Sequence, residues 1–201
     1  MNMNGTANSV CVSGSLRDLS ISHRIYGEAF YTFFIECGRL SEKTDLLPVT
    51  ASERLLFRHP LCEGAEVCVR GQLRSYNKLV DGKVRLYLTI FAREIEDKCN
   101  TVNEIELTGY VCKPPVYRVT PFGREITDML IAVNRAYNKS DYIPCIVWGR
   151  NARFASDFGV GDKVSIFGRV QSREYEKILE NGEKTHRTAY EVSVSRLQKE
   201  E

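Results

Sequence analysis

The second half of the sequence, from Asn103 to Leu197, decides the fold. It begins with NEIELTGYV, continues with RVTPFGREITDMLIAVNR and DYIPCIVWGR, and ends with GDKVSIFGRVQSREY, ENGEK and AYEVSVSRL. Its longer segments alternate apolar with polar residues and stop at Gly, Pro, Asn or Asp, which predicts five half-buried β-strands. A short helix-like segment follows Trp148. Gly109 and Gly168 allow strands to curve, so five strands in about 95 residues indicate a small closed barrel rather than a sandwich.

These segments strongly resemble the bacterial single-stranded DNA-binding protein family. The resemblance rests on N-x-I-x-L-x-G at the start, T-P-x-G-x-x-I, A-V-N-R and I-P-x-I-V-W-G in the middle, and G-D-x-V-x-I-x-G-R-V-x-S-R-x-Y at the end. One fragment alone would mean little, but all of them occur in the family's order and cover essentially the whole second half. The resemblance implies an oligonucleotide-binding (OB) fold and sequence-independent binding of single-stranded DNA.

The first half of the chain repeats the pattern of the second. Residues 8–97 follow residues 103–197 segment by segment, with an offset that drifts from 95 to 100, as expected if only loop lengths changed. Chance does not easily give so many ordered matches, so they indicate a duplicated domain. The matched pairs include Asn8 with Asn103, Asp45 with Asp141, Gly71 with Gly168, and Tyr76 with Tyr175.

The repeat predicts an all-β chain of two tandem five-stranded OB-fold barrels, each with a short helix after its third strand. The first, degenerate domain is predicted at residues 1–98 and the second at residues 102–201, joined by a short polar seam. Each helix is expected to plug one end of its barrel. Ser52 and Asn151 are the predicted helix caps. The predicted plugging side chains are those of Leu55, Leu56, Phe154 and Phe158.

Aromatic and basic residues are interleaved in the second copy. A protein that binds single-stranded nucleic acid without sequence choice needs aromatic faces for the bases and scattered Lys and Arg for the phosphates. The family resemblance implies that Tyr142 and Trp148 in the third strand and Tyr175 in the fourth stack on bases. Tyr137 matches a further such position in a shorter loop. The basic residues expected to contact phosphates are Arg135, Arg150, Arg169 and Arg173, with Lys139 beside them.

Strand parity supports this interpretation. Tyr142 and Trp148 are six residues apart, so a strand presents both on one face. Ile143, Cys145 and Val147 would then face the core. Composition alone leaves open the alternative that Trp148 is simply a large core residue, and the family pattern favours stacking.

The first copy departs from the pattern. Ser52 stands at the position of Trp148, and Leu46 at that of Tyr142, so Tyr76 is the remaining aromatic residue of the three. Arg74 and neighbouring cations make the last hairpin basic, which fits either DNA contact or a solvated hairpin. Four Phe and Tyr residues in the second strand fit core packing better than stacking. We expect this copy to bind DNA more weakly or mainly to make subunit contacts.

Composition and motifs exclude several classes of protein. The net charge is +2, so an anion-binding surface must arise from the arrangement of charges. The seven Cys form no C-x-x-C pair and the three His are scattered, which predicts reduced thiols and no metal site. No catalytic or cofactor-binding motif occurs, so we expect neither an enzyme nor a cofactor, with a metal-dependent nuclease as a formal alternative. The start of the chain lacks secretory-signal features and no apolar run approaches membrane-spanning length, which predicts a cytoplasmic protein.

The function predicted from these features is the coating of single-stranded DNA in replication, recombination or repair. The main alternative is a primosomal protein of the replication-restart type, whose barrels chiefly hold other proteins. A weaker one is an RNA-binding or cold-shock-like role. The chain ends at Glu201 without the flexible stretch and acidic tip of typical replicative relatives. That favours an accessory, mobile-element or primosomal paralogue, or a truncated chain.

A homodimer is also predicted. Relatives with one barrel per chain usually assemble four barrels, which a chain with two would reach as a dimer. An exposed strand edge requires a partner. The first strands of the two copies, at Val10–Val12 and Ile105–Leu107, are therefore expected to pair or pack across subunits. Replication or repair proteins are possible further partners, and no membrane contact is expected.

Overall fold

A computed structural model describes residues 7–39, 41–58, 61–80, 82–97, 100–178, 182 and 184–200. The first half contains β1 (Asn8–Ile25), β2 (Glu28–Gly38), β3 (Thr44–Ser52), α1 (Glu53–Arg58), β4 (Glu66–Val80) and β5 (Lys83–Asp97). The second half contains β6 (Asn103–Val111), β7 (Val116–Val119), β8 (Glu125–Arg135), β9 (Lys139–Trp148), α2 (Arg150–Ser156), β10 (Lys163–Ile178) and β11 (Lys184–Lys199).

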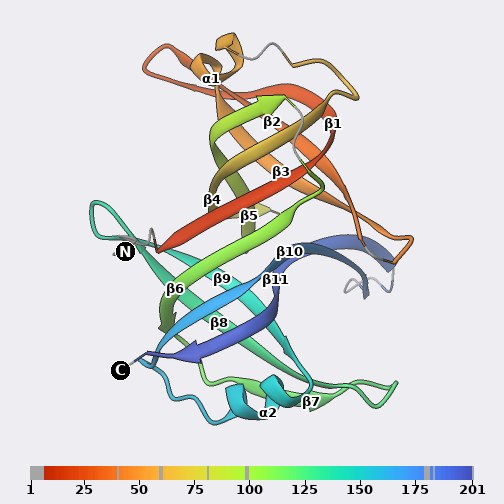
Figure 1. Ribbon diagram of the computed structural model, residues 1–201, viewed down its shortest axis with the longest axis vertical. Helices are drawn as coiled ribbons and strands as arrows, with labels where there is room; N and C mark the ends of the chain where they lie inside the picture. Colours follow the sequence, from red (N-terminus) through yellow and green to blue (C-terminus); the bar gives the residue numbers. More distant parts are fainter. Residues whose placement is uncertain are drawn as a thin grey trace.

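Each half closes into a five-stranded barrel. Hydrogen-bonded neighbours run β1–β2–β3–β5–β4 and back to β1 in the first half, and β6–β8–β9–β11–β10 and back to β6 in the second. The pairs β3–β5 and β9–β11 are parallel and the other pairs are antiparallel. The barrels lie one above the other along the long axis, with α1 and α2 at its opposite ends (Figure 1). The predicted all-β class, with OB-fold barrels and a short helix after the third strand, is confirmed.

Two glycines allow adjacent strands of the second barrel to approach closely. A Cβ atom at Gly168 of β10 would lie 2.2 Å from the carbonyl oxygen of Ser193, and one at Gly109 of β6 would lie 2.5 Å from that of Ala132. The β10–β11 register shifts by one residue at Gly168, and the β4–β5 register does the same at Gly71. These bulges increase local twist and let long strands bend around a small barrel. The curvature predicted at Gly109 and Gly168 therefore has a steric cause.

The second barrel has one strand more than the five predicted. In the first half, β1 runs without interruption to Ile25 and pairs with β2 from Ser15 to Ile25. In the second half, β6 ends at Val111, and β7 pairs separately with β8. Pro114 and Pro115 lie between them. Proline cannot donate to a β-ladder, so this segment leaves the sheet before the chain returns as β7.

Both helices lie where they were predicted, but one of the two predicted capping residues is wrong. Ser52 Oγ accepts a hydrogen bond from the Arg54 amide at 3.2 Å, as a cap does. The N-cap of α2 is Gly149, so the predicted Asn151 cap is wrong. Asn151 instead donates from Nδ2 to the carbonyl oxygen of Ser195 at 3.3 Å.

The plugging side chains are also only partly as predicted. Phe158 is buried, and Leu55 and Leu56 pack against the core. Phe154 is 49% exposed and contacts Phe158 edge-on, with ring centroids 4.9 Å apart. Within α2, the small side chains of Ala152 and Ala155 are the buried ones.

The two barrels are joined edge to edge within the chain. β1 and β6 form an antiparallel ladder from Asn8 opposite Leu107 to Val12 opposite Asn103. Figure 1 shows these strands side by side at the middle of the molecule. The expectation that the strand-1 segments pair across subunits is therefore wrong, because each finds its partner inside one chain. The predicted domain division stays a prediction, and residues 1–6, 98, 99 and 201 at its boundaries lie outside the described residues.

A reciprocal pair of buried carboxylates fastens the barrels further. Asp45 at the start of β3 accepts hydrogen bonds from the amide of Ser172 at 2.6 Å and from its hydroxyl at 2.8 Å. Asp141 at the start of β9 accepts one from the amide of Ser75 at 2.7 Å. Both carboxylates are fully buried. β10 of the second barrel is thus held against β3 of the first, and β4 of the first against β9 of the second. The two contacts are related by approximate two-fold symmetry.

Candidate nucleic-acid interface

The outer face of β9 carries two predicted stacking residues. Ile143, Cys145 and Val147 are buried, whereas Tyr142 is 44% exposed and Trp148 is 36% exposed. The predicted parity is therefore confirmed for these residues, and Trp148 is a surface residue. Ile146, which the same alternation places on the outer face, is buried. Six residues of extended strand separate the two rings along the chain, a span of about 20 Å. One aromatic ring therefore lies at each end of β9.

A shallow hollow of about 750 Å³ adjoins Trp148. Arg124 and Arg153 line it together with Trp148 and the turn that connects β7 to β8. Glu125 holds Arg153 in place by accepting from its Nε at 2.7 Å. Arg150 is exposed at the start of α2, two residues after Trp148. This end of β9 offers one aromatic face surrounded by cationic side chains.

The other end of β9 lies against the first barrel. The amide of Tyr142 donates to Ser75 Oγ of β4 at 2.8 Å. The residue after Ser75 is Tyr76, which is 50% exposed and stacks on Tyr87 with ring centroids 5.5 Å apart. Burial and the neighbouring Tyr87 raise the pKa of Tyr76. The structure therefore brings aromatic residues of both copies into one region.

Four further basic and aromatic residues surround this meeting point. Arg74 of β4 places its guanidinium 4.0 Å from the ring centroid of Phe91. Arg135 ends β8 with its Nε 3.1 Å from Asp141 Oδ2, and Lys139 begins β9 and is exposed. Tyr137 lies in the turn between them at a positive φ of 62° and is 94% exposed. Arg74, Arg135, Tyr137 and Lys139 together line a cavity between the barrels.

The remaining predicted residues lie on the opposite, pseudo-symmetric junction. Tyr175 of β10 is 38% exposed, and the guanidinium carbon of Arg173 lies 5.7 Å from its ring centroid. Arg173 Nε is 3.7 Å from Glu191 Oε1. Arg169 lies 3.9 Å from the buried Asp45 and donates to Gln171 at 3.1 Å. These cations are partly engaged by carboxylates, which reduces the charge available to a ligand.

The structure also revises one internal match. Tyr76 follows its bulge glycine, Gly71, by five residues, whereas Tyr175 follows Gly168 by seven. The residue equivalent to Tyr76 by register is Arg173, because Ser75 and Ser172 make the same contact with the opposite barrel. Tyr76 and Tyr175 share a strand parity but not a position.

Sequence reasoning missed two cations at these places. Arg124 lies in the turn beside Trp148 and lines its hollow. Arg93 of β5 lines the inter-barrel cavity with Arg74. Arg93 falls between the paired residues Ala92 and Glu94, at the bulge opposite Gly71. In the sequence, Gly71 indicated that the strand pairing there is irregular. Alternation alone does not predict the direction in which a bulged side chain such as that of Arg93 points.

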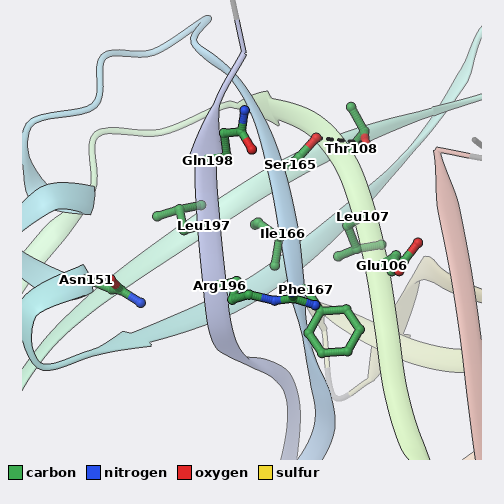
Figure 2. Close-up of a pocket in the computed structure, with 10 residues that line it drawn as sticks. All are labelled: Glu106, Leu107, Thr108, Asn151, Ser165, Ile166, Phe167, Arg196, Leu197 and Gln198. Carbon is green, nitrogen blue, oxygen red and sulfur yellow. Dashed lines mark hydrogen bonds between the residues drawn. The ribbon is translucent and has the colours of Figure 1, made fainter.

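A separate hollow of about 500 Å³ lies on the outer face of β6, β10 and β11 (Figure 2). Arg196 covers the ring of Phe167 there, with its guanidinium carbon 4.5 Å from the centroid. The hydroxyl groups of Thr108 and Ser165 are 3.2 Å apart. None of the predicted DNA-contacting residues lines this hollow, so it is not part of the candidate interface.

No group of three or more His, Cys, Asp and Glu side chains among the described residues is arranged to hold a metal ion. No helix in the described ranges has both the length and the hydropathy needed to cross a membrane.

Comparison with known proteins agrees with this geometry. Residues 102–199 match the model of the "Single-strand binding protein family". The "Single-stranded DNA-binding protein" of Clostridium tetani is 34% identical over 82 residues, which cover 37% of this chain and 57% of that protein. "Single-stranded DNA-binding protein A" of Bacillus subtilis is 33% identical over 82 residues, covering 37% and 48%. The match thus spans about half the length of these relatives.

A solved structure extends the similarity to both barrels at the level of the fold. The crystal structure of the wild-type single-stranded DNA binding protein from Thermus aquaticus superimposes with a TM-score of 0.77 at 20% identity. The superposition covers 96% of this chain and 93% of that one. Together with the fold, these comparisons support a bacterial protein related to the single-strand binding protein family, with the family match confined to the second barrel, residues 102–199.

Proposed function

We propose that this protein binds single-stranded DNA without sequence preference, by stacking bases on exposed aromatic rings and pairing phosphates with Lys and Arg. The observation that carries the proposal is the orientation of β9. Its inner side chains are buried while Tyr142 and Trp148 stand on the outer face. Large aromatic residues on a strand surface, with cations at both ends of the strand, suit the flat bases and charged backbone of a single strand.

The first barrel contributes to this surface rather than standing apart from it. The amide of Tyr142 donates to Ser75 Oγ of β4, and Arg74 and Tyr76 are the sequence neighbours of Ser75. This arrangement supports a path that starts at Trp148, follows β9 and continues onto the hairpin of the first barrel. We therefore favour a role in DNA binding for the first copy over a weak or purely structural role.

The protein acts by binding and without catalysis, and its role is the protection of single strands in replication, recombination or repair in the cytoplasm. Replication and repair proteins are its expected protein partners. We propose that the chain assembles as a homodimer, which brings four barrels together. Because β1 and β6 already pair with each other, the dimer contact must use surfaces other than these two edges. Light scattering should give about twice the chain mass of 22.9 kDa, and a monomer at micromolar concentration would contradict the dimer.

Titration with poly-dT, in parallel with duplex DNA and RNA of equal length, tests the function. We expect tight binding to poly-dT, weak binding to the duplex, and an affinity that falls as salt rises because phosphate contacts release counterions. Equal affinity for the duplex, or no binding at low salt, would contradict the proposal. Binding to protein partners without binding to DNA would support the primosomal alternative.

A further inference from the structure

We infer that the cavity between the barrels, lined by Arg74, Arg93, Arg135 and Lys139, is a phosphate subsite that holds the DNA backbone where the strand passes from one barrel to the other. The inference rests on the proposed function and adds a specific place and a specific chemistry to it. It also gives the degenerate first barrel a part in binding that its missing aromatic residues do not suggest.

The cavity is built by both halves of the chain. β4 and β5 of the first barrel supply Arg74 and Arg93, and β8 and β9 of the second supply Arg135 and Lys139. Its volume is about 420 Å³, which is room for roughly fourteen waters at about 30 Å³ each. A hydrated phosphodiester therefore fits without any displacement of the backbone.

The charge in this cavity is not balanced. Four cationic side chains line it, and no acidic side chain does so among the described residues. Asp141 is fully buried, already receives the amide of Ser75 and lies 3.1 Å from Nε of Arg135, so it offsets one of the four charges. Concentrated positive charge in a concave, partly dehydrated place attracts anions strongly.

The hydrogen bonding of the arginines is also incomplete. Within the described part of the chain, Nε of Arg74 and Nε of Arg135 are buried without a hydrogen-bond partner. Arg135 Nε lies 3.1 Å from Asp141 Oδ2, but the pair lacks hydrogen-bond geometry. Burial lowers the pKa of Arg74, and the nearby Arg135 and Arg93 lower it further. Asp141 is the carboxylate paired with this group of arginines, and a phosphate supplies further acceptor oxygens and further negative charge.

The pseudo-symmetric junction on the other side of the molecule contains more buried negative charge than this cavity. There, Gln171 occupies the position equivalent to Arg74 and donates to Glu191 at 2.8 Å. Glu191 is buried, and its equivalent on β5 is Thr89, which carries no charge. Asp45 pairs with Arg39 and lies 3.9 Å from Arg169. Two buried carboxylates thus face three arginines at that junction, Arg39, Arg169 and Arg173. At the Arg74 junction one buried carboxylate faces four cations, so the larger excess of positive charge favours that side for an anion.

The surroundings of the cavity identify the anion as nucleic-acid backbone. Tyr137 lies at its rim and is almost fully exposed. Tyr142 begins the aromatic face of β9 three residues after Lys139, and Tyr76 follows Arg74 by two. A phosphate held between these rings leaves its neighbouring bases within reach of exposed aromatic faces, which is the pattern of non-selective single-strand binding.

The test compares exposed cations at symmetric positions. Lys139 lies two residues before Asp141 at the cavity, and Lys43 lies two residues before Asp45 at the pseudo-symmetric junction; both are exposed. Lys139→Gln and Arg93→Gln should each weaken oligo-dT binding and reduce the magnitude of the salt slope by about 0.7, the contribution of one phosphate contact in a single strand. The double variant should reduce it by about 1.4. Lys43→Gln should change neither quantity.

Each outcome separates this inference from the proposed function. Wild-type protein that binds oligo-dT, with an unchanged affinity and salt slope in the double variant, would refute the subsite and leave the function standing. Wild-type protein that binds no oligo-dT would overturn both. If inorganic phosphate raises the melting temperature of the wild type but not of the double variant, while oligo-dT binding is equal in both, the cavity takes a free anion and the inference is wrong.

Discussion

Two cysteine thiols lie in environments that suppress their ionisation. Burial raises the pKa of Cys145 strongly, with a further rise from Glu191. Burial and the nearby Asp45 raise the pKa of Cys37 to about 12. The thiolate is the reactive form, and reagents must also reach the sulfur. These residues are therefore structural parts of the two cores and not reactive groups.

Alkylation of the native protein at pH 8 checks this contrast. Cys62 is exposed, so it should react with iodoacetamide within minutes, while Cys37 and Cys145 stay unmodified until the protein is denatured. Mass spectrometry of tryptic peptides identifies the sites. Rapid modification of Cys145 in folded protein would show that the β9 face described as the core is accessible to solvent.

At the residue scale, the sequence predicted side-chain direction better than electrostatic partners. Strand alternation placed Tyr142 and Trp148 on the surface and Ile143 in the core, because a period of two follows from strand geometry. The interleaving of basic and aromatic residues predicted phosphate contacts for Arg135 and Arg169, and that stays a prediction. The sequence did not show that each also lies near a buried carboxylate, Asp141 or Asp45. Those contacts depend on how the barrels pack, and no local pattern encodes that.

At the scale of elements, the bulge in β10 sets the path of the longest hairpin. Gly168 lies where a Cβ atom would be 2.2 Å from the Ser193 carbonyl oxygen and 3.2 Å from Val194 Cα. Backbone atoms cannot move aside as a flexible side chain can. The small barrel therefore depends on the absence of a side chain at this position.

Gly168→Ala should destabilise the protein by about 1–3 kcal/mol, the usual cost of forcing extra atoms into a packed place. Gly38→Ala is the matched control, because a Cβ atom there meets nothing within 4 Å and the backbone is not in the left-handed region. Urea unfolding measures both variants. Equal midpoints for the two would mean that the strands at Gly168 are not closely packed.

The elements that the sequence misjudged have identifiable causes. The second barrel was expected to have five strands, but Pro114 and Pro115 interrupt the segment after β6 and β7 forms as a separate strand. Asn151 was expected to cap α2, but the helix begins earlier, at Arg150, with Gly149 as N-cap at φ 60°. Asparagine is a common cap, yet tertiary contact with Ser195 takes its side chain instead.

At the scale of the whole molecule, the two halves behave structurally as one body. One cluster of buried apolar residues includes strands of both barrels, and the β1–β6 ladder continues the sheet across the junction. We therefore expect a single cooperative thermal transition, with equal calorimetric and van't Hoff enthalpies. Two separate transitions would contradict the continuous core.

The buried carboxylate Asp141 should matter to that transition. Asp141→Ala leaves the Ser75 amide without an acceptor, which costs about 1–3 kcal/mol for a buried donor. Asp128→Ala removes a carboxylate that pairs with Arg118 at the surface, and should cost about 0–1 kcal/mol. Scanning calorimetry of the two variants compares them directly. A larger loss in Asp128→Ala would mean that the inter-barrel contact does not hold the barrels together.

The duplication was readable from the sequence, but the relation between the copies was not. Ordered matches such as Asp45 with Asp141 predicted two similar barrels. The same first strands were expected to pair between subunits, whereas they pair within the chain. Pairing within the chain and pairing between subunits would both provide hydrogen-bond partners for the same strand edges. The periodicity of the sequence therefore cannot distinguish them. Only the three-dimensional arrangement shows that Ser75 of one copy, next to Tyr76, bonds to the backbone of Tyr142 of the other.

The fluorescence of Trp148 tests base stacking most directly, because it is the only tryptophan in the chain. Saturating oligo-dT should quench its emission, and Trp148→Ala should weaken binding by roughly 1–3 kcal/mol without changing the melting temperature. Phe57→Ala is the control, since Phe57 is an exposed aromatic residue on α1, at the far end of the first barrel. Unchanged emission at saturation, together with equal affinities for Trp148→Ala and Phe57→Ala, would contradict stacking on β9.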